Sequence, residues 1–180
     1  MNLESLNNDL ILIENINSIN PLLFNEIINN TNWDDSLLAR KTVSYGIPYN
    51  YNNMIYSKQI FPKYISDLAA IVEKHIGFHP NNCLINFYYE SKSKMGFHSD
   101  QIDILEKDTG IVIFSLGSNR IMKFKHKNDL TLFFEIELRS QSLLYMTQNF
   151  QNNWLHAILP TTEINNERIS ITFRKIKSYL

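Results

Sequence analysis

The sequence predicts one mainly β domain in which helices flank an antiparallel β core. At 180 residues, with 44% hydrophobic and 19% charged residues, the chain has the size and composition of a single globular domain. From residue 83 onward, short runs of β-branched and aromatic residues are separated by polar turns. No helical periodicity intervenes between these runs. We therefore expect a sandwich, jelly roll or barrel.

Two helices are expected before this core. Asn20 followed by Pro21 indicates a helix start, with Asn as N-cap and Pro in the first turn. The run LLFNEIINN then keeps near-helical spacing of its apolar residues. A second helix is expected to begin near Pro62 and to end around Gly77, and one apolar face is formed by Ile65, Leu68, Ala69, Val72 and Ile76.

Seven strands are expected in the second half of the chain. Their sequences are CLINFYYE, GIVIFSLG, NRIMKFKHK, LTLFFEIEL, SLLYMT, WLHAIL and RISITFRKI. No internal repeat or low-complexity linker is present. Residues 1–180 are therefore expected to form a single domain, with 1–60 as an N-terminal elaboration and 83–177 as the β core.

Composition and charge exclude several classes of protein. No run approaches the roughly 20 apolar residues that a membrane span requires, and the N-terminus lacks the features of a secretory signal. The single cysteine, Cys83, cannot form an internal disulfide, so an intracellular protein (cytoplasmic, or nuclear in a eukaryote) is expected. A formal net charge of −1 gives no global electrostatic argument for nucleic acid or membrane binding. We expect a monomer.

A histidine and a carboxylate two residues apart, His98 and Asp100, form a candidate metal site. Residues two apart on a strand project to the same side, and a set of two histidines and one carboxylate holds Fe(II) with open coordination positions. His156, in the run NNWLHAILP, is the best candidate for the third ligand. Taken alone, the pair is also compatible with a polar turn, and His156 with a hydrogen-bonded core residue.

Two arginines end the last strand. Arg168 and Arg174 are six residues apart and share one face with Ser170 and Thr172, whereas the alternate positions are apolar. Buried guanidinium groups are costly unless they meet anions. A dicarboxylate bound beside a metal ion would meet this need, and a solvent-facing edge strand is the alternative.

These motifs, in this order, resemble the AlkB family of 2-oxoglutarate- and Fe(II)-dependent dioxygenases, in particular its DNA-repair homologues. The family's L-I-N-R-Y strand matches 84–88, its His-x-Asp pair matches 98–100, and its closing R-x-N-x-T-F-R motif matches 168–174. SLGSNRIMKFKHK is similar to the family's S-x-G turn and basic strand. The resemblance extends from about Ala39 to Lys177. It implies a double-stranded β-helix, a form of jelly roll, with an N-terminal lid.

The resemblance also implies roles for individual residues. His98, Asp100 and His156 would bind Fe(II). Arg168, helped by Tyr88, would pair with the distal carboxylate of 2-oxoglutarate. The carboxylate end near the metal would be contacted by Arg174 and Asn86. Ser170 stands where the family has Asn, which changes one hydrogen bond in the cofactor pocket.

Substrate residues are expected in the lid and beside the metal. RKTVSYGIPYNYNN is similar to the lid of the repair enzymes, where a flipped-out base stacks on an aromatic residue. Tyr51 is the candidate stacking residue, with Tyr49 beside it and Tyr45 lining the pocket. Packing within the loop is the alternative.

The basic strand and the segment after Asp100 complete the candidate substrate contacts. Lys123, Lys125 and Lys127 alternate, so they share a strand face that could follow a phosphate backbone or simply be solvated. Repair members often carry an acid two residues after the metal aspartate. Ile102 stands there in this chain, with Asp103 one position later and on the opposite face if the segment is a strand.

The sequence therefore predicts an oxidative demethylase of N-alkylated bases in DNA or RNA that uses Fe(II), 2-oxoglutarate and O₂. The first alternative is a dioxygenase of the same fold that acts on a protein side chain or a small metabolite. The second is a non-catalytic jelly-roll binding module. The presence of all three candidate metal ligands and both arginines disfavours the module.

Overall fold

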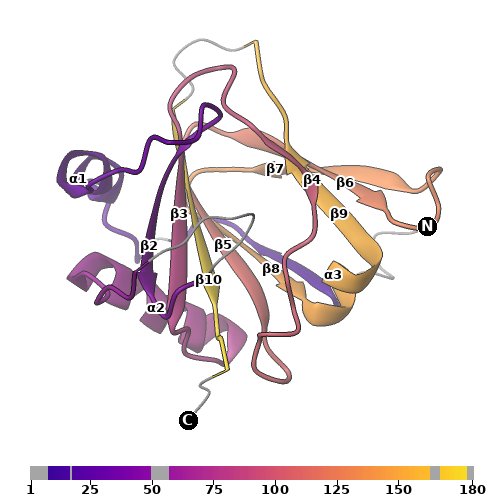
Figure 1. Ribbon diagram of the computed structural model, residues 1–180, viewed down its shortest axis with the longest axis horizontal. Helices are drawn as coiled ribbons and strands as arrows, with labels where there is room; N and C mark the ends of the chain where they lie inside the picture. The colour runs from indigo at the N-terminus through magenta and orange to yellow at the C-terminus, as the bar shows by residue number, and fades with distance from the viewer. Residues whose placement is uncertain (1–7, 17, 50–56, 163–166, 178–180) are drawn as a thin grey trace.

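Two antiparallel sheets form the core of the protein (Figure 1). The computed structural model describes residues 8–16, 18–49, 57–162 and 167–177. The larger sheet has six strands in the order β1-β8-β5-β10-β3-β2, and the smaller has four in the order β4-β9-β6-β7. The elements are β1 (Leu10–Ile13), α1 (Leu23–Asn30), β2 (Lys41–Gly46), α2 (Lys63–Ile76), β3 (Asn82–Tyr88), β4 (Met95–His98), β5 (Gly110–Gly117), β6 (Arg120–His126), β7 (Phe133–Leu138), β8 (Ser142–Thr147), α3 (Gln148–Asn153), β9 (Trp154–Ile158) and β10 (Arg168–Arg174).

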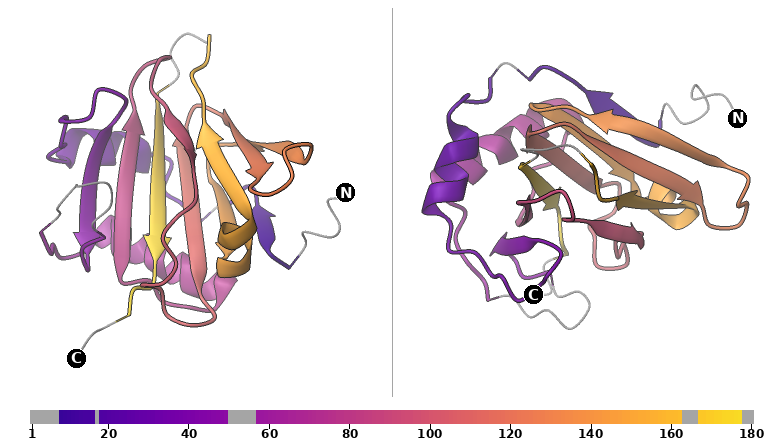
Figure 2. Two further views of the ribbon diagram at one scale, coloured as in Figure 1. Left: turned by 45° about the vertical axis from the view of Figure 1, so that its right-hand side comes forward. Right: turned by 90° about the horizontal axis from the view of Figure 1, so that it is seen from above.

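The six-stranded sheet is covered on both faces. Helices α1 and α2 lie against its outer face, and the four-stranded sheet lies across the inner one (Figure 2). The alternation along β10 separates these environments. Ile169, Ile171 and Phe173 pack with Leu23 and Ile27 of α1 and with Ile65, Leu68, Ala69 and Val72 of α2 in one buried apolar cluster, here called the helix-side cluster. Arg168 and Arg174 are buried on the opposite face of the strand. The two-faced strand predicted from RISITFR is thereby confirmed.

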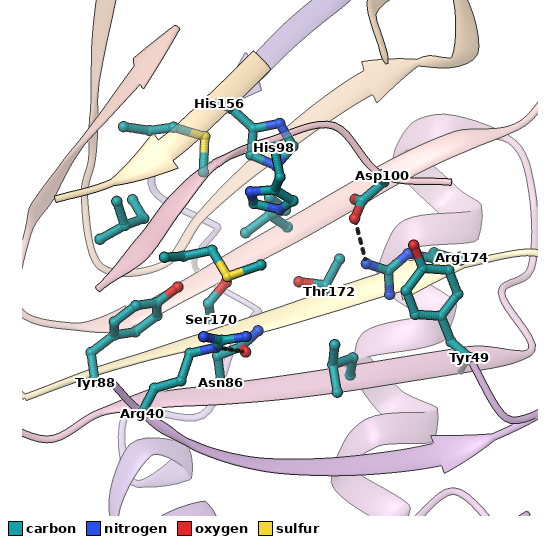
Figure 3. Close-up of a pocket in the computed structure, with 15 residues that line it drawn as sticks. Arg40, Tyr49, Asn86, Tyr88, His98, Asp100, His156, Ser170, Thr172 and Arg174 are labelled. Atoms are coloured by element: carbon teal, nitrogen blue, oxygen red, sulfur yellow. Dashed lines mark hydrogen bonds and ion pairs between the residues drawn. The ribbon is translucent and has the colours of Figure 1, made fainter. Parts of the chain in front are cut away.

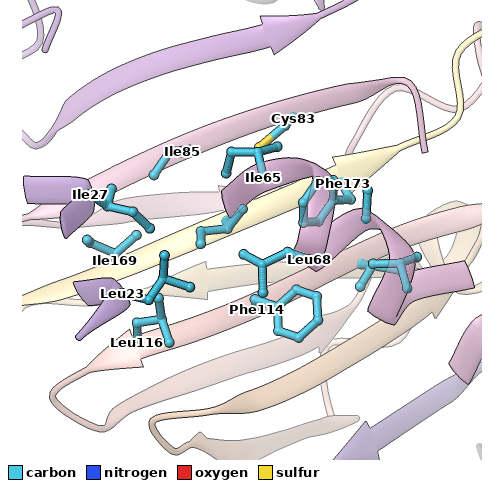
Figure 4. Close-up of a cluster of buried hydrophobic side chains, with 14 of the residues drawn as sticks. Leu23, Ile27, Ile65, Leu68, Cys83, Ile85, Phe114, Leu116, Ile169 and Phe173 are labelled. Carbon is cyan, nitrogen blue, oxygen red and sulfur yellow. The ribbon is translucent and has the colours of Figure 1, made fainter. Parts of the chain in front are cut away.

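The helix-side cluster carries most of the large apolar side chains (Figure 4). α2 buries Ile65, Leu68, Ala69 and Val72, as its periodicity predicts. It ends at Gly77, whose φ of +91° places it in the left-handed region that favours glycine. α1 begins later than predicted. Asn20 does not cap it but accepts a hydrogen bond from the N–H of Leu22 at 3.0 Å.

All seven strands predicted from the sequence are present, and their arrangement confirms the jelly-roll expectation. Three strands and one helix were not predicted. β1, β2 and β4 have four to six residues each. α3 has six residues and is capped by Thr147, whose hydroxyl accepts from the N–H of Phe150 at 3.1 Å. In the described residues, no helix is long and apolar enough to cross a membrane.

Phe114 is expected to be a major contributor to the stability of the fold. Its side chain is fully buried on β5 and packs edge-on against Phe173, with ring centroids 6.1 Å apart. Phe114→Ala should lower the free energy of unfolding by about 3–5 kcal/mol, because it removes a large apolar side chain and leaves a cavity. Urea denaturation measures this. As a control, Phe133→Ala on exposed β7 should change stability by no more than about 0.5 kcal/mol; equal losses in both variants would contradict the core assignment.

Candidate active site

A pocket lies between the two sheets and is lined by residues from both (Figure 3). The six-stranded sheet supplies its polar floor from β3 and β10. The four-stranded sheet supplies histidine and methionine side chains from β4, β6 and β9. The lining residues are Arg40, Tyr49, Leu84, Asn86, Tyr88, Met95, His98, Asp100, Ile113, Met122, His156, Ile158, Ser170, Thr172 and Arg174.

Two histidines face each other across neighbouring strands of this pocket. His98 on β4 is paired directly with His156 on β9, and the ring centroids are 4.3 Å apart. The strand pairing is irregular between Met95 and His98. This irregularity is of the kind produced by a β-bulge. It allows Met95 and His98 both to line the pocket, although residues three apart on a regular strand would point to opposite faces.

The surroundings of both histidines favour metal binding. The Nδ1 atom of His98 lies 2.8 Å from the carbonyl oxygen of Gly96. A ligating histidine commonly donates one ring N–H to such an acceptor, which leaves the other nitrogen for the ion. The Nδ1 atom of His156 is buried and has no hydrogen-bond partner in the described part of the chain. Burial, followed by the nearby His98, lowers the pKa of His156 to about 3, so the ring is neutral at pH 7, as a metal ligand must be.

Asp100 lies beside the histidine pair but outside the strand. β4 ends at His98, so the expectation that both residues lie on one strand is wrong. The N–H of Asp100 donates to Oε1 of Gln151 at 2.9 Å, and its Oδ1 accepts from Nη2 of Arg174 at 3.1 Å. Burial alone would raise the pKa of Asp100, but the cationic Arg174 and the two histidines outweigh it, and the pKa is lowered. The carboxyl group is therefore ionised.

The histidine pair is assembled, whereas the carboxylate faces the arginine (Figure 3). Among the described residues, no three His, Cys, Asp or Glu side chains already stand in the arrangement of a complete metal site. The donor set itself fits a divalent iron ion. It combines two imidazoles with one ionised carboxylate, and Nδ1 of His156 has no hydrogen-bond partner among the described residues.

Arg168 is fully buried next to the pocket, not in its lining. Nη2 donates to Oγ of Ser115 at 2.9 Å, and the guanidinium carbon lies 5.3 Å from the centroid of the Tyr88 ring. Nε and Nη1 have no partner in the described residues. Burial lowers the pKa of Arg168 to about 10, which still leaves it charged at pH 7. A buried cation with two unused donors is suited to an anionic ligand.

Arg40 was not predicted and is the main addition to the site. It precedes β2 and donates from Nε to Oδ1 of Asn86 at 2.7 Å. Asn86 in turn lies opposite Ser170 in the pairing of β3 with β10. The polar–apolar alternation of KTVSY was the available signal, since it marks a strand at the border of the pocket.

The tyrosines predicted to contact the substrate do not share one location. Tyr49 lines the pocket. The prediction that Tyr45 lines it is wrong, because Tyr45 and Val43 alternate with Thr42 and Ser44 along β2 and pack in the helix-side cluster. Burial and the neighbouring Tyr64 raise the pKa of Tyr45. Tyr51, the candidate for base stacking, lies outside the described residues.

The residues after Asp100 do not reach the pocket. Ile102 and Asp103 lie in an irregular segment, not in a strand. Ile102 packs against the core between the sheets, and Asp103 is exposed, with its carbonyl oxygen accepting from Nζ of Lys177 at 2.7 Å. The structure therefore places neither side chain among the pocket-lining residues.

The lysines of the basic strand are not among the pocket-lining residues either. Nζ of Lys125 is 4.5 Å from the centroid of the Phe97 ring, and Lys123 pairs with Glu135 at 2.6 Å. Lys127 donates to the carbonyl oxygen of Gln151 at 2.7 Å. The three lysines thus make three different kinds of contact and do not form a free basic stripe.

Comparisons with known proteins identify the family of this chain. The family described as the 2OG-Fe(II) oxygenase superfamily matches residues 27–174. The chain is 29% identical over 174 residues to mouse tRNA (carboxymethyluridine(34)-5-O)-methyltransferase ALKBH8, covering 89% of this chain and 26% of that protein. It is 27% identical to rat alpha-ketoglutarate-dependent dioxygenase alkB homolog 3, covering 76% and 50%. It is 25% identical to human DNA oxidative demethylase ALKBH2, covering 77% and 57%.

A solved structure, that of OsALKBH1, shares the fold. The TM-score is 0.65 at 16% sequence identity, and the match covers 93% of this chain and 98% of the other. The chain spans 26%, 50% and 57% of the three curated relatives named above. Fe(II) and 2-oxoglutarate are the metal and cosubstrate that the family match implies. On this evidence the chain belongs to the 2OG-Fe(II) oxygenase superfamily and is an AlkB-like member of it.

Proposed function

We propose that this protein oxidatively demethylates N-alkylated bases in DNA or RNA. The observation that carries the proposal is one pocket in which a histidine pair and an ionised aspartate come together, with the buried Arg168 next to it, whose Nε and Nη1 have no partner in the described residues. The printed names of two relatives, an alpha-ketoglutarate-dependent dioxygenase and a DNA oxidative demethylase, support the reaction class.

The charged residues in and beside the pocket divide into metal ligands and anion contacts. His98, His156 and Asp100 would hold Fe(II) on one side of the pocket. When bound, Fe(II) and 2-oxoglutarate supply the oxidation of an N-methyl group by O₂, with succinate, CO₂ and formaldehyde as products. Arg168 would meet the distal carboxylate of 2-oxoglutarate, since it is the buried cation whose Nε and Nη1 lack partners in the described residues.

The protein's part is to hold His156 and Asp100 in the protonation states that metal binding requires. Burial keeps His156 neutral, and Arg174 keeps Asp100 ionised. The lining of Met95, Met122 and Ile158 makes the metal side of the pocket apolar. An apolar lining lowers the local dielectric constant, which strengthens the ion pair between Arg174 and Asp100.

One observation favours a second candidate, a dioxygenase of a protein side chain or small metabolite. Neither Ile102 nor Asp103 lines the pocket, so no acid stands at the position where repair members often carry one. The net charge of −1 also gives no general attraction to a polyanion. A direct comparison of methylated nucleic acids with methylated peptides as substrates therefore decides between the two candidates.

Purified protein supplied with Fe(II), 2-oxoglutarate and O₂ is expected to release formaldehyde from methylated oligonucleotides. Single- and double-stranded DNA and RNA are compared with methylated peptides, and succinate is quantified in each reaction. Asp100→Asn serves as the matched inactive control, because the amide keeps the size of the side chain and removes its charge. Formaldehyde from peptides alone would favour the second candidate. If no reaction forms succinate and the protein binds no metal, the assignment of the protein as a dioxygenase is refuted.

A further inference from the structure

Tyr49 occupies an unusual place for a residue outside a helix or strand. It follows β2, yet only 2% of it is exposed. Its ring covers the guanidinium group of Arg174, with 4.1 Å between Cζ of the arginine and the ring centroid. Its hydroxyl oxygen accepts a hydrogen bond from the N–H of Gln101 at 3.1 Å. One side chain thus contacts both Arg174 and the residue that follows Asp100.

Arg174 is the residue that orients the Asp100 carboxylate. Its Nη2 lies 3.1 Å from Oδ1 of Asp100, and the two side chains are 3% and 7% exposed. Its Nη1 donates to Oδ1 of Asn82 at 3.3 Å. No described residue donates to the second carboxylate oxygen, Oδ2. The ion pair therefore determines how that second oxygen is presented to the histidine pair.

The ring of Tyr49 strengthens this ion pair in two ways. A cation over an aromatic face is attracted to it. The ring also covers one face of the guanidinium group, so water is kept from it and the attraction between Arg174 and Asp100 is less screened. Removing the ring would open space for water beside Arg174 and allow the carboxylate to turn.

The backbone before Tyr49 is held firmly to the start of β3. The N–H of Ile47 donates to the carbonyl oxygen of Asn81 at 2.8 Å, and Nδ2 of Asn82 donates to the carbonyl oxygen of Ile47 at 2.8 Å. A β-carbon at Gly46, whose φ is +80°, would lie 2.1 Å from the Asn81 oxygen. Asn82 thus contacts both the segment that carries Tyr49 and Arg174.

We propose that Tyr49 is a positioning residue that orients Asp100 for metal binding by acting through Arg174. The proposal rests on the proposed function in that it takes Asp100 as a metal ligand. It gives Tyr49 a role in the metal centre, in place of the substrate contact that the sequence predicted for it.

The proposal is tested by measuring the affinity for Mn(II), a redox-stable probe of the site, by calorimetry. Tyr49→Leu is expected to weaken Mn(II) binding about 10- to 100-fold, as loss of groups that orient metal ligands typically does. Tyr49→Phe keeps the ring over Arg174 and should stay within about threefold of wild type, since only one hydrogen bond is lost. Tyr145→Leu, a partly buried tyrosine that contacts Phe78 outside the pocket, is the control and should bind Mn(II) normally.

A double-mutant cycle separates positioning from general loss of structure. In an Arg174→Met background, Tyr49→Leu should cause no further loss of Mn(II) affinity, because the residue through which it acts is gone. The visible spectrum of bound Co(II) should change in Tyr49→Leu and be restored in Tyr49→Phe. Thermal melting without metal verifies folding, and Tyr49→Met replaces the leucine variant if that variant melts below the assay temperature.

The possible outcomes separate the role of Tyr49 from the proposed function of the protein. Normal Mn(II) affinity in Tyr49→Leu, equal weakening in Tyr145→Leu, or additive losses in the Arg174→Met background would overturn the role of Tyr49 alone. Failure of the wild-type protein to bind Mn(II) would overturn the proposed function, and the role of Tyr49 with it.

Discussion

His156→Ala is expected to reduce succinate and formaldehyde formation by more than about 100-fold, since groups that merely orient metal ligands already contribute about 10- to 100-fold. His98→Ala should behave in the same way, because the two rings face each other 4.3 Å apart and would share one ion. Loss of either leaves an incomplete donor set. The measurement is turnover with Fe(II) and 2-oxoglutarate, together with calorimetric Mn(II) binding.

The control for both variants is His75→Ala. His75 is exposed on α2 and outside the pocket, so turnover and metal affinity should match those of the wild type. Circular dichroism of each variant verifies the fold. Retained turnover in either pocket variant would remove that histidine from the metal site, even if the other one behaved as expected.

Arg168→Met is expected to weaken 2-oxoglutarate binding about 30- to 4000-fold. Truncating one partner of a buried charge pair costs about 2–5 kcal/mol, and each 1.4 kcal/mol is about a tenfold change in affinity. The same substitution should leave the ligand-free protein as stable as wild type or more stable, because Arg168 is a fully buried cation whose Nε and Nη1 have no partners in the described residues. Calorimetry with Mn(II) and 2-oxoglutarate measures the first effect, and urea denaturation the second.

The opposite signs of the two effects make this prediction specific. Arg139→Met is the control, since Arg139 pairs with Glu14 and Glu137 at the surface and should alter neither quantity appreciably. A large loss of stability in Arg168→Met with unchanged 2-oxoglutarate affinity would identify Arg168 as a structural residue and contradict its role in cofactor binding.

The strands that were predicted are rich in β-branched and aromatic residues, as in GIVIFSLG on β5. Their alternation also revealed which face of β10 carries the arginines. β4 cannot be predicted from the sequence, because it has four residues, one of them a glycine. Its irregular pairing with β9 also removes the regular alternation of polar and apolar side chains. Its assignment depends on pairing with β9, a contact between residues far apart in the chain, which local sequence does not encode.

The candidate site also contains residues that local sequence predicts and contacts that it does not. His98, Asp100, His156 and Arg174 were predicted from motif order and all line one pocket. The contact of Arg40 with Asn86 joins residues 46 positions apart, and no spacing rule marks it. Tyr45 was misplaced because the facing of β2 follows from its pairing with β3, not from the aromatic content of the segment.

The position of β4 has a consequence for how the site responds to partial unfolding. His98 is the last residue of a short strand at the edge of its sheet, whereas His156 lies on β9, which is paired on both sides. Edge segments open at a lower free energy than central strands. Separation of β4 from β9 would carry His98 away while the six-stranded sheet and its helices stay folded. Metal binding and global folding are therefore separable properties of this protein. Metal affinity can be lost under conditions in which the six-stranded sheet remains folded.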